Sequence, residues 1–94
     1  MKKKHFNIRV YGSVQGVFFR ASARTHAQAL DITGLARNES DGSVYMEAEG
    51  EEKNLKQFIE WCRRGPERAI VTNVEAEEGA LKNFSSFEVM RGVH

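Results

Sequence analysis

Cysteine and proline are almost missing from this 94-residue chain, which contains one of each. Because a single cysteine cannot close an internal disulfide, Cys62 gives no support for a secreted, disulfide-built scaffold, and we expect a cytoplasmic protein. No apolar run approaches the roughly 18 residues of a membrane span, and none follows the basic start, so neither a membrane anchor nor a signal peptide is expected. The length fits one domain over residues 1–94, with residues 1–4 as a basic flexible tail.

A strong net charge is also missing, since 14 Lys and Arg nearly balance 13 Asp and Glu. The distribution is nevertheless uneven. Residues 1–38 hold seven basic side chains and one acidic one, a net charge of +6, whereas residues 39–94 hold seven basic and twelve acidic side chains, a net charge of −5. A basic first part suits a small anionic ligand, although three of its charges belong to the expected tail. A nucleic-acid groove is typical of a more basic domain, so no nucleic-acid partner is expected.

Clustered metal ligands are absent from the sequence as well. His5, His26 and His94 are scattered, and Cys62 has no CxxC partner, so we expect no metal site. Cys62 instead continues an apolar helical stripe and is expected to fill the core, with Trp61 at the core edge.

Apolar periodicity predicts the order of the secondary structure. Two-residue alternation and helical spacing indicate a strand at 5–12, a helix at 20–32, strands at 35–40 and 43–49, a helix at 51–64, and strands at 70–78 and 85–90. Gly34 is expected just past the first helix, and Asp41-Gly42 predicts a tight hairpin between the second and third strands. The order βαββαβ with a short fifth strand predicts an α+β, ferredoxin-like sandwich: one mainly antiparallel sheet covered on one face by two helices.

The first segment with chemical potential is Gly12-Ser13-Val14-Gln15-Gly16-Val17-Phe18-Phe19-Arg20, which follows a strand and opens a helix. Backbone N–H groups at a helix N-terminus form an anion site, and glycines allow close approach of a ligand. Arg20 can hold two phosphate oxygens at once, which a lysine cannot do. The alternative is an ordinary glycine-containing turn with a surface arginine. The segment is no Walker loop, because no Gly-Lys-Ser/Thr follows.

The second segment runs from Gly34 to Val44 and places Asn38 in a strand near a hairpin. A carboxamide has both donor and acceptor groups, so Asn38 can orient a water or a carbonyl. Taken alone, a turn-capping or exposed asparagine is the commoner case.

Together the two segments resemble the acylphosphatase family. The first fits its pattern Gly-x-Val-Gln-Gly-Val-x-aromatic-Arg, and the second fits Gly-x-Ala/Val-x-Asn-x-x-x-Gly-x-Val followed after five residues by Gly50. Length and element order extend the resemblance over nearly the whole chain. Leu35 stands where the family often has a large aromatic residue, which should affect packing more than chemistry.

The resemblance implies hydrolysis of the carboxyl–phosphate bond of small-molecule acyl phosphates without a metal or an organic cofactor. A monomer is the simplest expectation for the oligomeric state. It implies that Arg20 binds the substrate phosphate, that Asn38 positions the attacking water, and that the phosphate-binding loop comprises Ser13, Val14, Gln15, Gly16, Val17, Phe18 and Phe19. One alternative is a non-catalytic ferredoxin-like module that binds RNA or a small anionic effector, although only Tyr11 and Tyr45 are expected as exposed strand aromatics. Another is the same site serving a different phosphate compound, such as carbamoyl phosphate.

Overall fold

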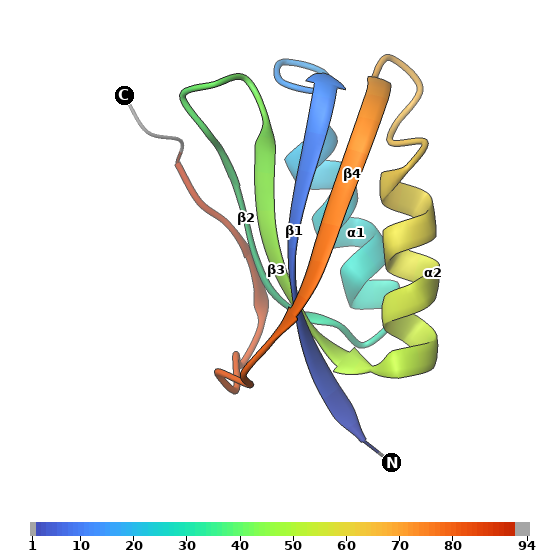
Figure 1. Ribbon diagram of the computed structural model, residues 1–94, viewed down its shortest axis with the longest axis vertical. Helices are drawn as coiled ribbons and strands as arrows, with labels where there is room; N and C mark the ends of the chain where they lie inside the picture. The colour runs from blue at the N-terminus through green and yellow to red at the C-terminus, as the bar shows by residue number, and fades with distance from the viewer. Residues whose placement is uncertain (1, 92–94) are drawn as a thin grey trace.

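A five-stranded sheet forms the framework of the protein in the computed structural model, which describes residues 2–91. Met1 and residues 92–94, including His94, lie outside the described residues. The elements are β1 (Lys3–Ser13), α1 (Phe19–Ala29), β2 (Thr33–Asn38), β3 (Val44–Glu51), α2 (Glu52–Cys62), β4 (Ile70–Gly79) and β5 (Phe87–Val89). The strand order is β4-β1-β3-β2-β5 (Figure 1). All neighbouring pairs are antiparallel except β2 and β5, which are parallel.

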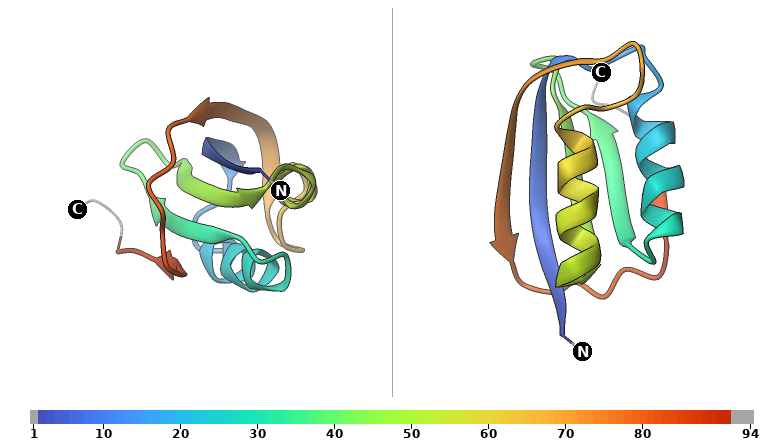
Figure 2. Two further views of the ribbon diagram at one scale, coloured as in Figure 1. Left: turned by 90° about the horizontal axis from the view of Figure 1, so that it is seen from below. Right: turned by 90° about the vertical axis from the view of Figure 1, so that its right-hand side faces the viewer.

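Both helices cover the same face of the sheet, as the side view shows (Figure 2). The core between the layers includes Ile8 and Val10 of β1, Phe19 of α1 and Leu55 and Phe58 of α2, all almost fully buried. Cys62 is fully buried, and Trp61 packs at the core edge between Phe58, Phe19 and His26. The α+β ferredoxin-like sandwich predicted from the sequence is confirmed.

The end of α1 differs from the prediction. The helix stops at Ala29, three residues before the expected end at 32, and Asp31 follows it in the left-handed conformation (φ 54°). Gly34 lies inside β2, because a Cβ at this position would collide with the backbone carbonyl of Glu47 on the neighbouring strand. This glycine therefore permits close strand packing rather than ending the helix.

The hairpin between β2 and β3 is also longer than predicted. β2 ends at Asn38 and β3 begins at Val44, so five residues connect them in place of an Asp41-Gly42 turn alone. The Asp41 carboxylate accepts bonds from the N–H and the hydroxyl of Ser43, and the N–H of Glu39 donates to the Ser43 carbonyl oxygen at 2.9 Å. These side-chain bonds favour the wider turn.

The predicted flexible tail is wrong for Lys3 and Lys4, which begin β1 and pair with Glu51 and Gly50 of β3. Lys4 also forms an ion pair with Glu52 at 3.0 Å. Helix α2 is shorter than predicted, since it runs from residue 52 to 62 and Gly65 (φ 71°) follows the final turn. The apolar stripes of the two helices correctly predicted which side of each helix faces the core. The residues at which the helices end depend on local turn chemistry and differ from the prediction.

Candidate active site

A cavity of about 270 Å³ lies where the β1–α1 loop meets the end of β2. Arg20 and Asn38, which come from different segments of the chain, both line it. The remaining lining residues are Val14, Gly16, Phe18, Phe19, Ala21 and Val89. The two side chains singled out in the sequence analysis therefore share one cavity.

Unusual backbone conformations shape the β1–α1 loop. Gly12 (φ 127°) lies where the pairing of β1 with β4 shifts, and a Cβ there would collide with the carbonyl oxygen of Ile70. Gly16 (φ 76°) has open space around it, so its glycine is required by the backbone conformation alone. Phe18 precedes α1 in the left-handed conformation (φ 61°), which costs a non-glycine residue roughly 1–2 kcal/mol.

The first turn of α1 presents its N–H groups at this loop. Ser22 makes the first helical hydrogen bond, to the Phe18 carbonyl oxygen at 3.0 Å, so the N–H groups of Phe19, Arg20 and Ala21 have no acceptor within the helix. Phe18 provides no side-chain cap, and the first turn contains no acidic residue. The positive end of the helix is therefore left for an external anion.

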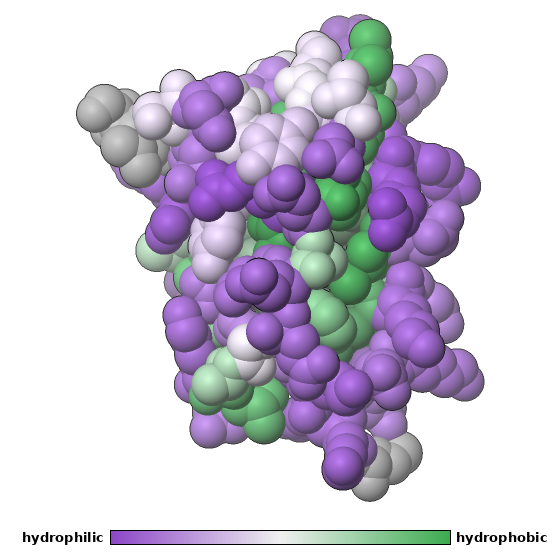
Figure 3. All heavy atoms as spheres, in the orientation of Figure 1, coloured by the Kyte–Doolittle hydropathy of each residue, from purple (hydrophilic) through white to green (hydrophobic). Residues whose placement is uncertain are grey.

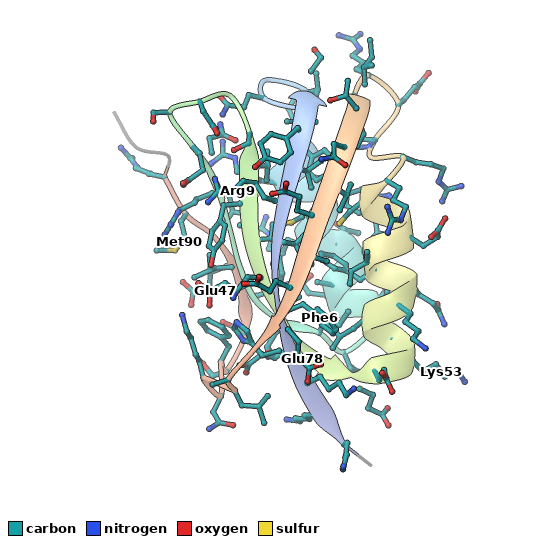
Figure 4. The ribbon with its side chains drawn as sticks, in the orientation of Figure 1. Phe6, Arg9, Glu47, Lys53, Glu78 and Met90 are labelled. Atoms are coloured by element: carbon teal, nitrogen blue, oxygen red, sulfur yellow. The ribbon has the colours of Figure 1, made fainter. Side chains whose placement is uncertain are left out.

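Arg20 is held in place by the C-terminal segment. Its Nη1 donates a hydrogen bond to the Met90 carbonyl oxygen at 2.7 Å, and the Met90 N–H donates in turn to Ala36 of β2 at 2.8 Å. Figure 4 labels Met90 in the C-terminal segment that runs beside β2. Within residues 2–91 Arg20 forms no ion pair, so its positive charge is not neutralised by a protein carboxylate there.

Asn38 is the last residue of β2 and pairs with Val44 of β3. Its Oδ1 atom is buried and has no hydrogen-bond partner among residues 2–91. A buried acceptor without a partner costs about 1–3 kcal/mol, so this atom calls for a ligand or a water molecule.

Gln15 links the two halves of the site. Its Nε2 donates to the carbonyl oxygens of Glu39 and Ser43 at 2.8 and 2.9 Å, which fastens the β1–α1 loop to the turn that follows Asn38. The side chain therefore points to the turn and not into the cavity. Ser13 and Val17 do not line the cavity either: Ser13 ends β1, and Val17 packs against the core.

Known proteins with similar sequences identify the family. The family model described as Acylphosphatase matches residues 6–89. The chain belongs to the acylphosphatase family. An acylphosphatase of Marinobacter nauticus is 46% identical over 93% of this chain and 96% of its own, and one of Methylococcus capsulatus is 44% identical over 99% and 100%. The solved structure of an acylphosphatase from Coxiella burnetii superimposes with a TM-score of 0.91 at 40% identity, covering 94% of this chain and 93% of its own.

As an acylphosphatase, the chain is an enzyme, a hydrolase that acts on acid anhydrides. Within residues 2–91 no three His, Cys, Asp or Glu side chains form a group that could hold a metal ion. None of the helices in that part of the chain is long and apolar enough to cross a membrane. Leu35 lies outside the Arg20 cavity and lines a separate one of about 210 Å³ with Phe84 and Met90.

A larger cavity, of about 500 Å³, lies on the face of the sheet that the helices leave uncovered. Hydrophilic side chains dominate this side of the molecule (Figure 3). Arg9 lines the cavity together with Tyr45, Glu75 and Glu77, so carboxylates face any anionic ligand there. Neither the glycine-rich loop nor Asn38 reaches this cavity, and its mixed charge disfavours an RNA backbone.

The two tyrosines expected to be exposed on this face are half-buried and bonded to carboxylates. Tyr11 donates to Glu75 at 3.1 Å and Tyr45 to Glu47 at 2.9 Å. The guanidinium groups of Arg9 and Arg37 lie 5.1 and 4.6 Å from the Tyr45 ring centroid. Burial, reinforced by the Glu47 carboxylate, raises the pKa of Tyr45 to about 12. The Tyr45 ring is therefore engaged by two guanidinium groups, and the Tyr11 hydroxyl is engaged by Glu75.

A buried polar cluster on the same face, formed by His5, Glu47 and Glu49, was not predicted from the sequence. All three are nearly inaccessible. His5 Nδ1 lies 2.7 Å from Glu49 Oε2, and its Nε2 lies 3.3 Å from Glu47 Oε1. Glu47 is also paired with Lys82 at 2.8 Å.

The 80–86 loop covers this cluster through backbone bonds to Glu49. The N–H groups of Lys82 and Phe84 both donate to its carboxylate, and the Phe84 ring stacks on His5. Burial alone would raise the pKa of Glu49, but the N–H of Lys82, the His5 ring and the N–H of Phe84 outweigh it and lower that pKa. The strand alternation offered no signal of this burial, because the loop that buries the cluster lies more than 30 residues away.

Proposed function

We propose that this enzyme hydrolyses the carboxyl–phosphate bond of acyl phosphates, with the phosphate bound by Arg20 and the β1–α1 loop and with water positioned by Asn38. One observation carries the proposal: Arg20 and Asn38 line a single cavity at the exposed positive end of α1. The guanidinium has donors to spare beyond the bond to Met90, and so can span two phosphate oxygens.

The substrate chemistry explains why so few groups are needed. An acyl phosphate, R–CO–O–PO₃²⁻, reacts with water to give R–COO⁻ and H₂PO₄⁻, which releases a proton near neutral pH. The carboxylate leaves as an anion, since carboxyl groups have pKa values of about 4. No general acid is therefore required. Phosphoryl transfer through a loose transition state depends on positioning and on charge stabilisation, which Arg20 and the loop N–H groups supply.

Asn38 supplies the position of the attacking water. Its buried Oδ1 lacks a partner and can accept a hydrogen bond from that water. The amide is too weak a base to remove the proton, so we propose that a phosphate oxygen of the substrate accepts it. Normal turnover of a substrate whose phosphate oxygens cannot be protonated would count against this step.

The test is hydrolysis of benzoyl phosphate at neutral pH with excess EDTA. We expect full activity, because the proposed reaction uses no metal ion and no other cofactor. Loss of activity that a divalent ion restores would refute metal independence. If the folded enzyme shows no rate above that of the uncatalysed reaction, the site is at most a binding site.

We also expect the enzyme to act as a monomer in the cytoplasm, on a small-molecule substrate and without a nucleic-acid partner. Sedimentation velocity of the purified protein tests the first expectation: a single species near the 10.7 kDa chain mass is predicted, and a dimer would contradict it.

A further inference from the structure

Phe18 is the most exposed large apolar side chain in the described part of the protein, at 78%. It lines the Arg20 cavity and directly precedes α1 in a left-handed conformation. A phenyl ring in water gains little from packing, so the fold offers no reason for a bulky side chain at this strained position. The two neighbouring residues differ: Val17 packs against the core and Phe19 is buried within it.

The cavity has two chemically different walls. One wall holds the guanidinium of Arg20, the amide of Asn38 and the N–H groups that open α1. The other is apolar, and its accessible part consists of Phe18, Ala21 and Val89. Ala21 lines the same cavity as Phe18, and its small, exposed side chain takes up little of the space there.

An acyl phosphate has two ends that match these walls. Once the dianionic phosphate lies at the polar wall, the acyl group must lie along the remaining wall or in solvent. An aromatic or branched acyl group would bury apolar surface against Phe18, and two rings would gain further from edge-to-face or offset packing. A methyl group would gain far less.

We propose that Phe18 is a specificity-determining residue that contacts the acyl group of the substrate, and that its ring raises kcat/KM for aromatic or large apolar acyl groups relative to acetyl. The assignment rests on the proposed function, since it takes the phosphate end to be bound at Arg20. It concerns the acyl end, which neither Arg20 nor Asn38 recognises.

The experiment compares kcat/KM for benzoyl phosphate and acetyl phosphate in wild type and in three variants. Phe18→Ala removes the ring but keeps a Cβ at the left-handed position. We expect it to lower the benzoyl-to-acetyl selectivity ratio about tenfold, chiefly through the KM for benzoyl phosphate. Phe18→Tyr keeps the ring and should keep the ratio. Leu81→Ala, a truncation of another exposed apolar residue that lies outside the cavity, should leave both substrates unaffected.

An unchanged selectivity ratio in Phe18→Ala would overturn the inference, whether or not the overall rate falls, because a residue that only shapes the loop affects both substrates alike. Loss of the ratio in Phe18→Tyr as well would also contradict it. These results are distinct from failure of the proposed function, in which folded wild type would hydrolyse neither substrate.

Discussion

Two polar regions of this protein lie at different places on one sheet and differ in how far their bonding capacity is used. Around His5, Glu47 and Glu49, each buried charged group contacts an opposite charge or a backbone N–H group. Around Arg20 and Asn38, the guanidinium has one protein acceptor and the amide oxygen has none among residues 2–91. Glu47 Oε1 makes no hydrogen bond among the described residues, but it lies within ion-pair distance of Lys82 and His5. Charges that are paired inside the protein stabilise a fold, whereas groups left without a partner beside a cavity are available to a substrate.

The comparison predicts that substitutions around Arg20 and Asn38 lower activity, whereas substitutions around His5, Glu47 and Glu49 lower stability. Substitution of Arg20 should give the largest effect. Arg20→Ala removes the charge that faces the transferred phosphoryl group and is expected to lower kcat/KM for benzoyl phosphate by at least about 10³-fold. The free energy of unfolding, measured in urea, should change little, because the side chain makes one bond to Met90.

Arg20→Lys serves as the conservative control. One ammonium group cannot replace a planar fork that spans two oxygens, so we expect this variant to be nearly as slow as Arg20→Ala. Wild-type rates in Arg20→Lys would refute two-point binding of the phosphate.

Asn38→Ala should give the next largest loss. We expect kcat to fall about 10²-fold while the inhibition constant of inorganic phosphate stays near its wild-type value. The variant should unfold at a similar urea concentration, since the lost Oδ1 has no protein partner among the described residues. An equal loss of turnover and phosphate affinity would reassign Asn38 to substrate binding.

Glu49→Gln should show the reverse pattern: its kcat should stay near the wild-type value, and its free energy of unfolding should fall. The glutamine keeps an acceptor for the 80–86 loop but loses the charge beside His5, which should cost about 1–3 kcal/mol of unfolding free energy at pH 7. The kcat of the folded variant for benzoyl phosphate should stay close to wild type. A large fall in kcat with unchanged stability would mean that the two regions are not separate in function.

The pH dependence of this destabilisation follows from the pKa of Glu49, which is lowered in the folded state. A lowered pKa gives stability that is complete above the unfolded value of about 4.3 and is lost as pH falls through the folded value. The difference in unfolding free energy between wild type and Glu49→Gln should therefore shrink in urea titrations below about pH 4. A difference that is constant from pH 7 to pH 3 would attribute the effect to packing.

Among the substitutions around the Arg20 cavity, Gln15→Ala should give the smallest effect. It removes two hydrogen bonds that fasten the β1–α1 loop to the turn after Asn38, without removing a group that lines the cavity. Without these bonds, the β1–α1 loop and the water at Asn38 should be poorly aligned, which should lower kcat about tenfold. If kcat is unchanged while unfolding free energy falls, the two bonds serve stability alone.

The sequence predicted the fold well because its apolar periodicity is strong. The stripe containing Leu55, Phe58 and Cys62 is buried as expected, and the alternation of Ile8 and Val10 marks the covered face of β1. Element ends were less predictable, since Asp31, and not a glycine, follows α1 in the left-handed conformation. Such ends depend on strand contacts that are remote in sequence, as with Gly34 against Glu47.

The site could be predicted in part, because Arg20 and Asn38 lie in recognisable local sequence patterns. The structure brings the two residues to one cavity. The Met90 carbonyl that holds Arg20 lies 70 residues away, and a backbone carbonyl has no residue-type signal. The direction of the Gln15 side chain likewise depends on a turn that is 24 residues distant.

The most direct test of the account is to find which bond the water breaks. Benzoyl phosphate hydrolysed by the enzyme in H₂¹⁸O should give inorganic phosphate that carries the label and benzoate that does not, because the proposed site holds the phosphorus at Arg20 and the loop, beside a water bound to Asn38. Label in the benzoate would show attack on the acyl carbon and would contradict the placement of phosphate and water proposed for this cavity.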